Sequence, residues 1–369
     1  MIVNYEEVFR AVEQATKILL VETPYKRRYI PLGLAKLWTL AEALGKEVEY
    51  SRGYRRRGED LVLATTMFSY EWPDIKKELD RALVADYHRR VIVGGIAATL
   101  LADKIGDLLP AVDVFPGYSK ELDGLRPAYD APWIIDDMWR STSYVFTSRG
   151  CPNACRYCAV RIIEPEGWVN DRWKIAIDED RPFVWLGDNN LTAQPREHLR
   201  DVCSTLSRLD KRVAIDSGVD CKHIDDEVAE LLASMKYKGR GLRVGFDRIG
   251  EDGHYKRAVE LLMSKGVRPD SMMSLVLFNY TDSPKEADYR MRVVAGYGIK
   301  PYPQCYVPLD WDLRSRFFVS EKWTRPLVDA FKKYWASARW TRLSFDRYLE
   351  KYEDRFGITP ECIEKWRSE

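Results

Sequence analysis

The sequence predicts an α/β fold with two successive series of parallel strands and crossover helices, followed by a helical tail. Three observations support this prediction. Short apolar runs alternate with amphipathic segments, their spacing is that of strands joined by helices, and no internal repeat interrupts the pattern. The chain has 369 residues, which is long enough for two domains.

The first series, residues 1–128, predicts a doubly wound, Rossmann-like domain. Glycine closes the first helical segment and proline lies near the start of the second, as expected at helix ends. Ligands bind such sheets beyond the carboxyl ends of the strands. The expected strands are 18–22, 47–51, 61–65, 91–95 and 111–117, and the expected helices are 31–45, 73–84 and 96–104.

A linker is expected at 129–143, because the segment 127–143 has two prolines and no helical period. The second series, residues 144–310, predicts a partial (β/α)6 barrel with its chemistry at the carboxyl ends of the strands. The tail, 311–369, is rich in Trp, Tyr, Arg and Lys at helical spacing, and we expect a helical extension. The expected strands are 144–148, 183–187, 212–216, 242–246, 273–278 and 302–308, separated by helices at 195–209, 225–236, 252–265 and 284–297.

Composition narrows the class of protein. The sequence is 46% hydrophobic and 31% charged, with a net charge of +1, which is typical of a soluble globular chain and gives no reason to expect nucleic acid as a partner. Two basic clusters, 26–28 and 55–57, lie in predicted loops without a stacking platform around them. The sequence has no run of eighteen apolar residues and no signal-peptide pattern, so we expect no membrane contact and a cytoplasmic location.

Three of the seven cysteines, Cys151, Cys155 and Cys158, lie in 147-TSRGCPNACRYC-158. The proline and asparagine between them favour a loop, which can wrap thiolates around one metal centre. Structural zinc needs four ligands, and no fourth thiol or imidazole is nearby in sequence. On a [4Fe–4S] cluster, three cysteines would leave one iron open to a chelating molecule. A non-catalytic zinc or iron–sulfur module remains an alternative.

With Tyr157 at the aromatic position, this motif resembles the radical SAM superfamily signature C-x3-C-x-Φ-C, and it follows the first predicted barrel strand as the family's motif does. The resemblance implies a [4Fe–4S] cluster on the three cysteines, with S-adenosylmethionine (SAM) chelated to the open iron. It implies reductive cleavage of SAM to a 5′-deoxyadenosyl radical, which takes hydrogen from a small-molecule substrate. It also implies an electron donor such as flavodoxin or ferredoxin.

The same resemblance implies that polar residues after the strands bind the cofactor. Asp188 and Asn189 stand where the family contacts the methionyl amine, although the usual GGE is absent. Asp216 and Ser217 are placed to meet ribose hydroxyls, and Arg248 to face the SAM carboxylate. For each, capping of the following helix is the alternative. The candidate cofactor-binding residues are Tyr157, Asp188, Asn189, Asp216, Ser217, Asp247, Arg248 and Asn279.

Cys305 is a candidate catalytic residue on the sixth expected strand, in PYPQCYVP. A thiol that points into the barrel could donate a hydrogen atom to a product radical or form a substrate adduct. A packed core cysteine is the alternative.

The first domain, with 92-IVGGIAATL-100, resembles the cobalamin-binding class of the superfamily. Many such domains carry D-x-H-x-x-G after the first strand, but here the loop reads 22-ETPYKRRYIPLG-33 and contains no histidine. Either cobalamin binds without a protein histidine, or the domain has lost the cofactor. The first interpretation implies a cobalamin-dependent radical methyltransferase, and the second implies cobalamin-free radical chemistry.

Overall fold

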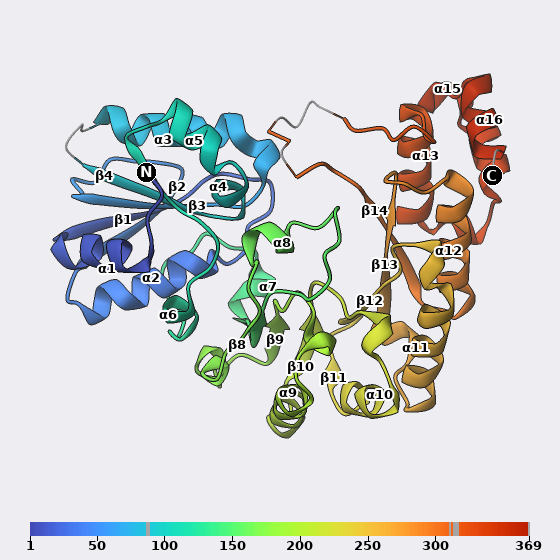
Figure 1. The fold of residues 1–369 in the computed structure, drawn as a ribbon, viewed down its shortest axis with the longest axis horizontal. Helices are drawn as coiled ribbons and strands as arrows, with labels where there is room; N and C mark the ends of the chain where they lie inside the picture. Colours follow the sequence, from blue (N-terminus) through green and yellow to red (C-terminus); the bar gives the residue numbers. More distant parts are fainter. Residues whose placement is uncertain (86–88, 310, 313–316, 368–369) are drawn as a thin grey trace. The chain divides into compact units, whose positions relative to one another are not determined.

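The computed structural model describes residues 1–85, 89–309, 311–312 and 317–367 (Figure 1). It confirms a mixed α/β chain whose main sheets are built from parallel strands. The chain divides into two compact units, Met1–Gly187 with Leu309–Arg316, and Asp188–Pro308 with Phe317–Glu369. The expected domain boundaries near 128 and 144 both fall inside the first unit, so they do not coincide with this division.

The first unit contains a five-stranded parallel sheet of order β2-β1-β3-β4-β5. Leu20 of β1 lies opposite Tyr50 of β2 and Leu63 of β3, which fixes the register. The strand order changes direction between β1 and β3, which is where sheets of this order bind ligands. All five strands occur where the sequence predicts them: β1 (Lys17–Glu22), β2 (Glu47–Arg52), β3 (Leu61–Thr66), β4 (Arg90–Gly95) and β5 (Val112–Phe115).

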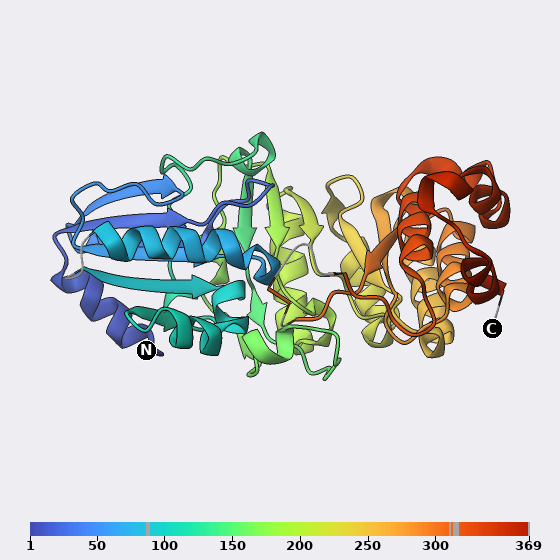
Figure 2. The same cartoon turned by 90° about the horizontal axis from the view of Figure 1, so that it is seen from above.

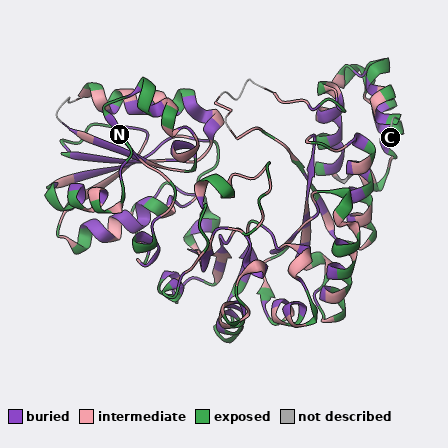
Figure 3. Ribbon diagram, in the orientation of Figure 1, coloured by how far each residue is buried: buried purple, intermediate pink, exposed green. Residues whose placement is uncertain are grey.

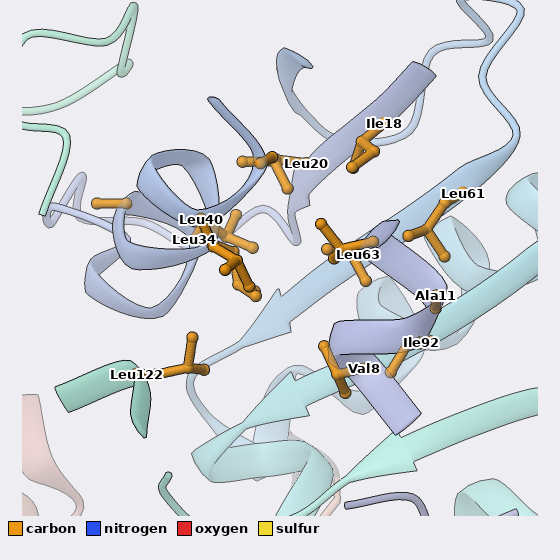
Figure 4. Packing of buried hydrophobic residues seen from close by; sticks show 14 of the residues in the cluster. Val8, Ala11, Ile18, Leu20, Leu34, Leu40, Leu61, Leu63, Ile92 and Leu122 are labelled. Carbon is orange, nitrogen blue, oxygen red and sulfur yellow. The ribbon is translucent and has the colours of Figure 1, made fainter. Parts of the chain in front are cut away.

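Helices cover both faces of this sheet (Figures 1 and 2). Side chains alternate along each strand, so Leu20 packs with one set of helices and Leu19 with the other. Figure 4 shows the first of these cores, and Figure 3 shows that the strands between them are largely buried. One face carries α1 (Tyr5–Gln14) and α2 (Leu32–Ala43); the other carries α3 (Trp72–Ala85), α4 (Ile96–Leu100) and α5 (Ala102–Leu108).

Two details of this region differ from the sequence prediction. The helix α1 was not expected, yet Asn4 and Glu7 form a reciprocal capping box at its start. The single helix expected at 96–104 is divided into α4 and α5, because Leu101 leaves helical geometry (φ −112°, ψ 21°).

The remainder of the first unit holds the cysteine motif. The expected strand 144–148 is split, since one strand ends at Val145 and a separate two-residue strand begins at Ser148. The strand β6 pairs with β9 in parallel, and β7 pairs with β8 antiparallel. The elements are α6 (Lys120–Asp123), α7 (Asp137–Arg140), β6 (Thr142–Val145), β7 (Ser148–Arg149), α8 (Val160–Ile163), β8 (Trp168–Val169) and β9 (Phe183–Leu186).

The second unit continues the alternation of strand and helix at the predicted positions. The strands β10 (Arg212–Ile215) and β11 (Lys236–Tyr237) pair in parallel, and a parallel sheet has the order β12-β13-β14. Its strands are β12 (Leu242–Gly245), β13 (Met272–Phe278) and β14 (Lys300–Cys305), so β14 ends three residues before the predicted limit. The helices are α9 (Arg196–Arg208), α10 (Asp226–Ala233), α11 (Asp252–Ser264) and α12 (Pro284–Gly296).

The tail is helical and packs through buried aromatic rings, such as Phe345 against Trp366, whose ring centres are 4.8 Å apart. Such edge-to-face pairs stabilise beyond the area that they bury. Among the described residues, no helix combines the length and the apolar character that crossing a bilayer requires. The tail helices are α13 (Arg325–Ala336), α14 (Phe345–Lys351), α15 (Glu353–Phe356) and α16 (Pro360–Arg367).

Candidate functional site

The three motif cysteines lie on an irregular segment between β7 and α8, residues 150–159, which we call the cysteine loop. It begins at Gly150, whose φ of +78° favours glycine. A Cβ there would lie 2.8 Å from the carbonyl oxygen of Glu166, so no other residue fits without a shift of the chain. A turn brings the Cys158 N–H to the Cys155 carbonyl at 3.0 Å. All three thiols are partly exposed.

Four charged side chains, Lys36, Asp123, Arg149 and Glu164, form a buried charge network at the base of this loop. Arg149 donates from Nε and Nη2 to the two oxygens of Asp123 at 2.7 and 3.0 Å, and from Nη1 to Glu164 Oε1 at 2.7 Å. Lys36 Nζ also donates to Asp123. Charge-assisted and bidentate bonds of this kind are the strongest that side chains make.

The network changes the protonation equilibria of its members. Burial alone would raise the pKa of the Asp123 carboxyl, but Arg149 and Lys36 outweigh burial and hold that pKa below its usual value. Burial lowers the pKa of Lys36, and the charge of Asp123 offsets this only in part. The opposite charges of Arg149, Lys36 and Asp123 therefore offset part of the cost of burying each of them.

Aromatic rings complete the surroundings of Arg149. Its guanidinium carbon lies 3.4 Å from the centre of the Phe146 ring and 5.5 Å from that of Tyr118. These contacts suit the planar guanidinium better than an ammonium group. At the end of β9, a Cβ on Gly187 would lie 2.6 Å from ring atoms of both Phe146 and Tyr144. The aromatic packing under the loop therefore depends on glycine at this position.

The chemistry of the donor set fits an iron–sulfur cluster, because thiolates are the ligands that such clusters prefer. The structure has all seven cysteines as thiols. Among the described residues, no three His, Cys, Asp or Glu side chains are grouped to hold a metal ion. Cys151, Cys155 and Cys158 are the residues that would hold a cluster here. Tyr157, the aromatic residue of the motif, lies on the same loop and is partly buried.

The predicted residues after β9 and β10 lie in the second unit. Asp188 is fully buried and Asn189 is partly buried, directly after the strand. Asp216 follows β10, and its carbonyl oxygen and its carboxylate both accept from Nη1 of Arg243, the former at 2.6 Å. Ser217 is exposed.

An open pocket of about 520 Å³ lies at the carboxyl ends of β12 and β13. Asp247 and Arg248, two of the predicted cofactor residues, line it. Asp247 also accepts the Leu277 N–H at 3.2 Å, and the exposed Arg248 pairs with Glu251 at 3.0 Å. The other lining residues, which the sequence did not single out, are Lys222, Ile249, Gly250, Glu251, His254, Tyr280, Thr281, Asp282 and Glu286.

Asn279 and Cys305 are brought together at the ends of β13 and β14. The Asn279 amide nitrogen lies 3.7 Å from the Cys305 sulfur and donates to the Phe318 carbonyl at 2.9 Å. The Asn279 oxygen accepts from the Ser320 N–H at 3.0 Å. Burial raises the pKa of the Cys305 thiol, and the bond from Asn279 offsets this in part. The Asn279 side chain thus binds the chain itself, while Cys305 presents a neutral thiol.

The sequence prediction missed the buried charge network. Arg149 is visible in the motif, directly before Gly150, but its partners Asp123 and Glu164 lie 26 and 15 residues away. No local spacing connects these residues, so a sequence pattern alone could not have identified them.

Comparison with protein-family models and with curated proteins gave no match to this sequence.

Proposed function

We propose that this protein is a radical SAM enzyme that cleaves S-adenosylmethionine reductively and takes a hydrogen atom from a small-molecule substrate. The observation that carries the proposal is that three thiols, at C-x3-C-x2-C spacing, lie on one irregular loop that follows the parallel strand β6 and the short strand β7. A fourth cysteine is missing from the motif, as the proposal requires. Cys151, Cys155 and Cys158 would hold a [4Fe–4S] cluster, which supplies the electron that breaks the sulfonium bond of SAM.

The finer fold in this proposal is a Rossmann-like domain followed by a partial (β/α)6 barrel. The strand order of the five-stranded sheet, with helices on both faces, supports the first part. The barrel would comprise β6, β9, β10, β12, β13 and β14. Parallel pairing within each unit supports this, and barrels of parallel strands place their chemistry at the carboxyl ends.

The pocket at the ends of β12 and β13 supports a ligand site in the second unit. Asp247 offers a carboxylate that accepts hydroxyl hydrogens, and Arg248 offers a guanidinium that pairs with a carboxylate. The guanidinium is complementary to the carboxylate of SAM, which is the role that the resemblance implies for Arg248. Their part is to bind and orient the ligand.

Cobalamin is not part of the proposal. The loop after β1 offers no imidazole to a cobalt ion. Polar side chains already occupy the space at the carboxyl end of β1. Glu22 is fully buried there, the Tyr50 hydroxyl donates to its carboxylate at 2.5 Å, and Arg52 lies 3.5 Å from it. The residues present therefore do not fit a cofactor that is held through its lower ligand.

Metal analysis after anaerobic reconstitution tests the proposal. We expect about four irons and four sulfides per chain, as one such cluster requires. The reduced protein should give an electron paramagnetic resonance signal that changes when SAM is added. Replacement of all three motif cysteines by alanine should abolish the cluster. One equivalent of zinc, with neither iron nor a response to SAM, would instead indicate a structural metal module.

A further inference from the structure

We infer that Arg149 and Glu164 are positioning residues that clamp the two ends of the cysteine loop. The inference rests on the proposed role of this loop as a cluster site. Arg149 carries no donor for iron, and both oxygens of Glu164 already accept bonds from Arg149 and Gly150. Both residues would therefore act through the backbone that presents Cys151, Cys155 and Cys158.

The Glu164 carboxylate joins the start of the loop to the end of α8. Its Oε2 accepts the backbone N–H of Gly150 at 2.7 Å, and its Oε1 accepts Nη1 of the neighbouring Arg149 at 2.7 Å. The bond between Gly150 and Glu164 spans 14 residues of the chain. All three motif cysteines lie within this closed segment.

The clamp is in turn fixed to the rest of the first unit. The bidentate bond of Arg149 to Asp123 connects it to α6, and the bond from Lys36 to Asp123 connects it to α2. The side chains of these four residues are at most 12% exposed. Water therefore cannot replace a missing partner, and removal of one ion leaves another buried without compensation.

A loop with fixed ends has fewer conformations to lose when its thiolates gather around one centre. The buried charge network to which the clamp belongs consists of two cations and two anions, so the clamp holds the backbone beside the thiolates without adding net charge. Residues that orient metal ligands in this way typically contribute a factor of 10–100 to metal affinity. Loss of the clamp should therefore weaken cluster binding while leaving every thiol in place.

Hydrogen exchange of the full-length, metal-free protein tests the clamp without any cofactor. In Glu164→Ala, we expect backbone amides of residues 150–159 to exchange about tenfold faster or more, the usual effect of losing hydrogen bonds to a charged group. Glu59→Ala is the matched control, because Glu59 forms an equally buried pair with Arg89 in the same unit, 2.6 Å apart. The control should leave exchange of the loop unchanged. Unchanged exchange in Glu164→Ala would overturn the inference.

Retention of iron against a chelator then separates a positioning role from a merely structural one. Glu164→Ala should lose iron about tenfold faster than the wild type. Glu164→Gln, which keeps an acceptor for Gly150, should lie between them. Faster exchange combined with unaltered iron retention and an unaltered resonance spectrum would overturn the positioning role. If the wild type binds no cluster at all, the proposed function itself fails, so the two failures are distinguishable.

Discussion

The amide of Asn279 bridges Cys305 and the segment that leads into the tail: its nitrogen lies 3.7 Å from the Cys305 sulfur and 2.9 Å from the Phe318 carbonyl oxygen. Asn279 is fully buried and has a left-handed backbone with φ of +62°, a conformation that asparagine tolerates better than most residues. Both residues were candidates for the site. Their contact joins the ends of two neighbouring strands, β13 and β14.

Asn279→Ala should lower the free energy of unfolding by about 2–4 kcal/mol, because two buried partners lose their hydrogen bond and alanine disfavours the left-handed backbone. Chemical denaturation monitored by tryptophan fluorescence measures this. Ser217→Ala, at an exposed site after β10, is the control and should change stability by less than about 0.5 kcal/mol. Equal stability of the two variants would exclude the structural role of Asn279.

Gly150→Ala should destabilise the first unit by about 1–3 kcal/mol, since the new Cβ would require a strained backbone. It would also lie 2.8 Å from the Glu166 carbonyl oxygen and 2.9 Å from Cα of Gly167. Gly167→Ala is the matched control across this contact, because a Cβ on Gly167 meets no atom within 4 Å. Thermal unfolding should separate the two variants. If Gly167→Ala lost more stability than Gly150→Ala, the cysteine loop would not begin with the strained backbone described here for Gly150.

Glu22 should make stability depend on pH. Burial raises the pKa of its carboxyl above the usual 4.5, and bonds from tyrosine hydroxyls together with the charge of Arg52 offset this only in part. The folded state thus binds a proton more tightly than the unfolded state, so this contribution to stability is full below pH 4.5 and falls as the pH rises through the folded pKa.

The Glu22→Gln variant carries no titratable group at this position. Its stability should therefore lack the decrease with rising pH that Glu22 causes. Denaturation midpoints of the two proteins should therefore converge near pH 4.5 and separate at neutral pH, with the variant the more stable. If the denaturation midpoints of the two proteins changed in parallel between pH 4.5 and neutral pH, the effect could not be assigned to Glu22.

Much of the fold was predictable because its signals are local. The start of α12 follows from Ser283, Pro284 and Glu286, which form a capping box with proline in the first turn. The helix α1 carries a similar signal in Asn4 and Glu7, which the hydrophobic pattern of the chain did not reveal. The split between β6 and β7 was not predictable from a local pattern, because the two strands pair with different partners, β9 and β8, that are distant in sequence.

The candidate site also has one part that the sequence reveals and another that only the fold reveals. Cysteine spacing can be read from the motif alone, as can the position of Asp247 after a strand. The buried charge network cannot, since Lys36 and Asp123 are 87 residues apart and become neighbours only through the tertiary fold. Pairing of buried ions is set by three-dimensional packing and leaves no periodic pattern in the sequence.

The central claim is that the three motif thiols support reductive cleavage of SAM. The most direct measurement is 5′-deoxyadenosine released from SAM by the reconstituted, dithionite-reduced protein, compared with the variant in which Cys151, Cys155 and Cys158 are all alanine. We expect 5′-deoxyadenosine from the wild type and none above background from the variant. A wild-type protein that carries a full complement of iron yet forms no 5′-deoxyadenosine would contradict the account.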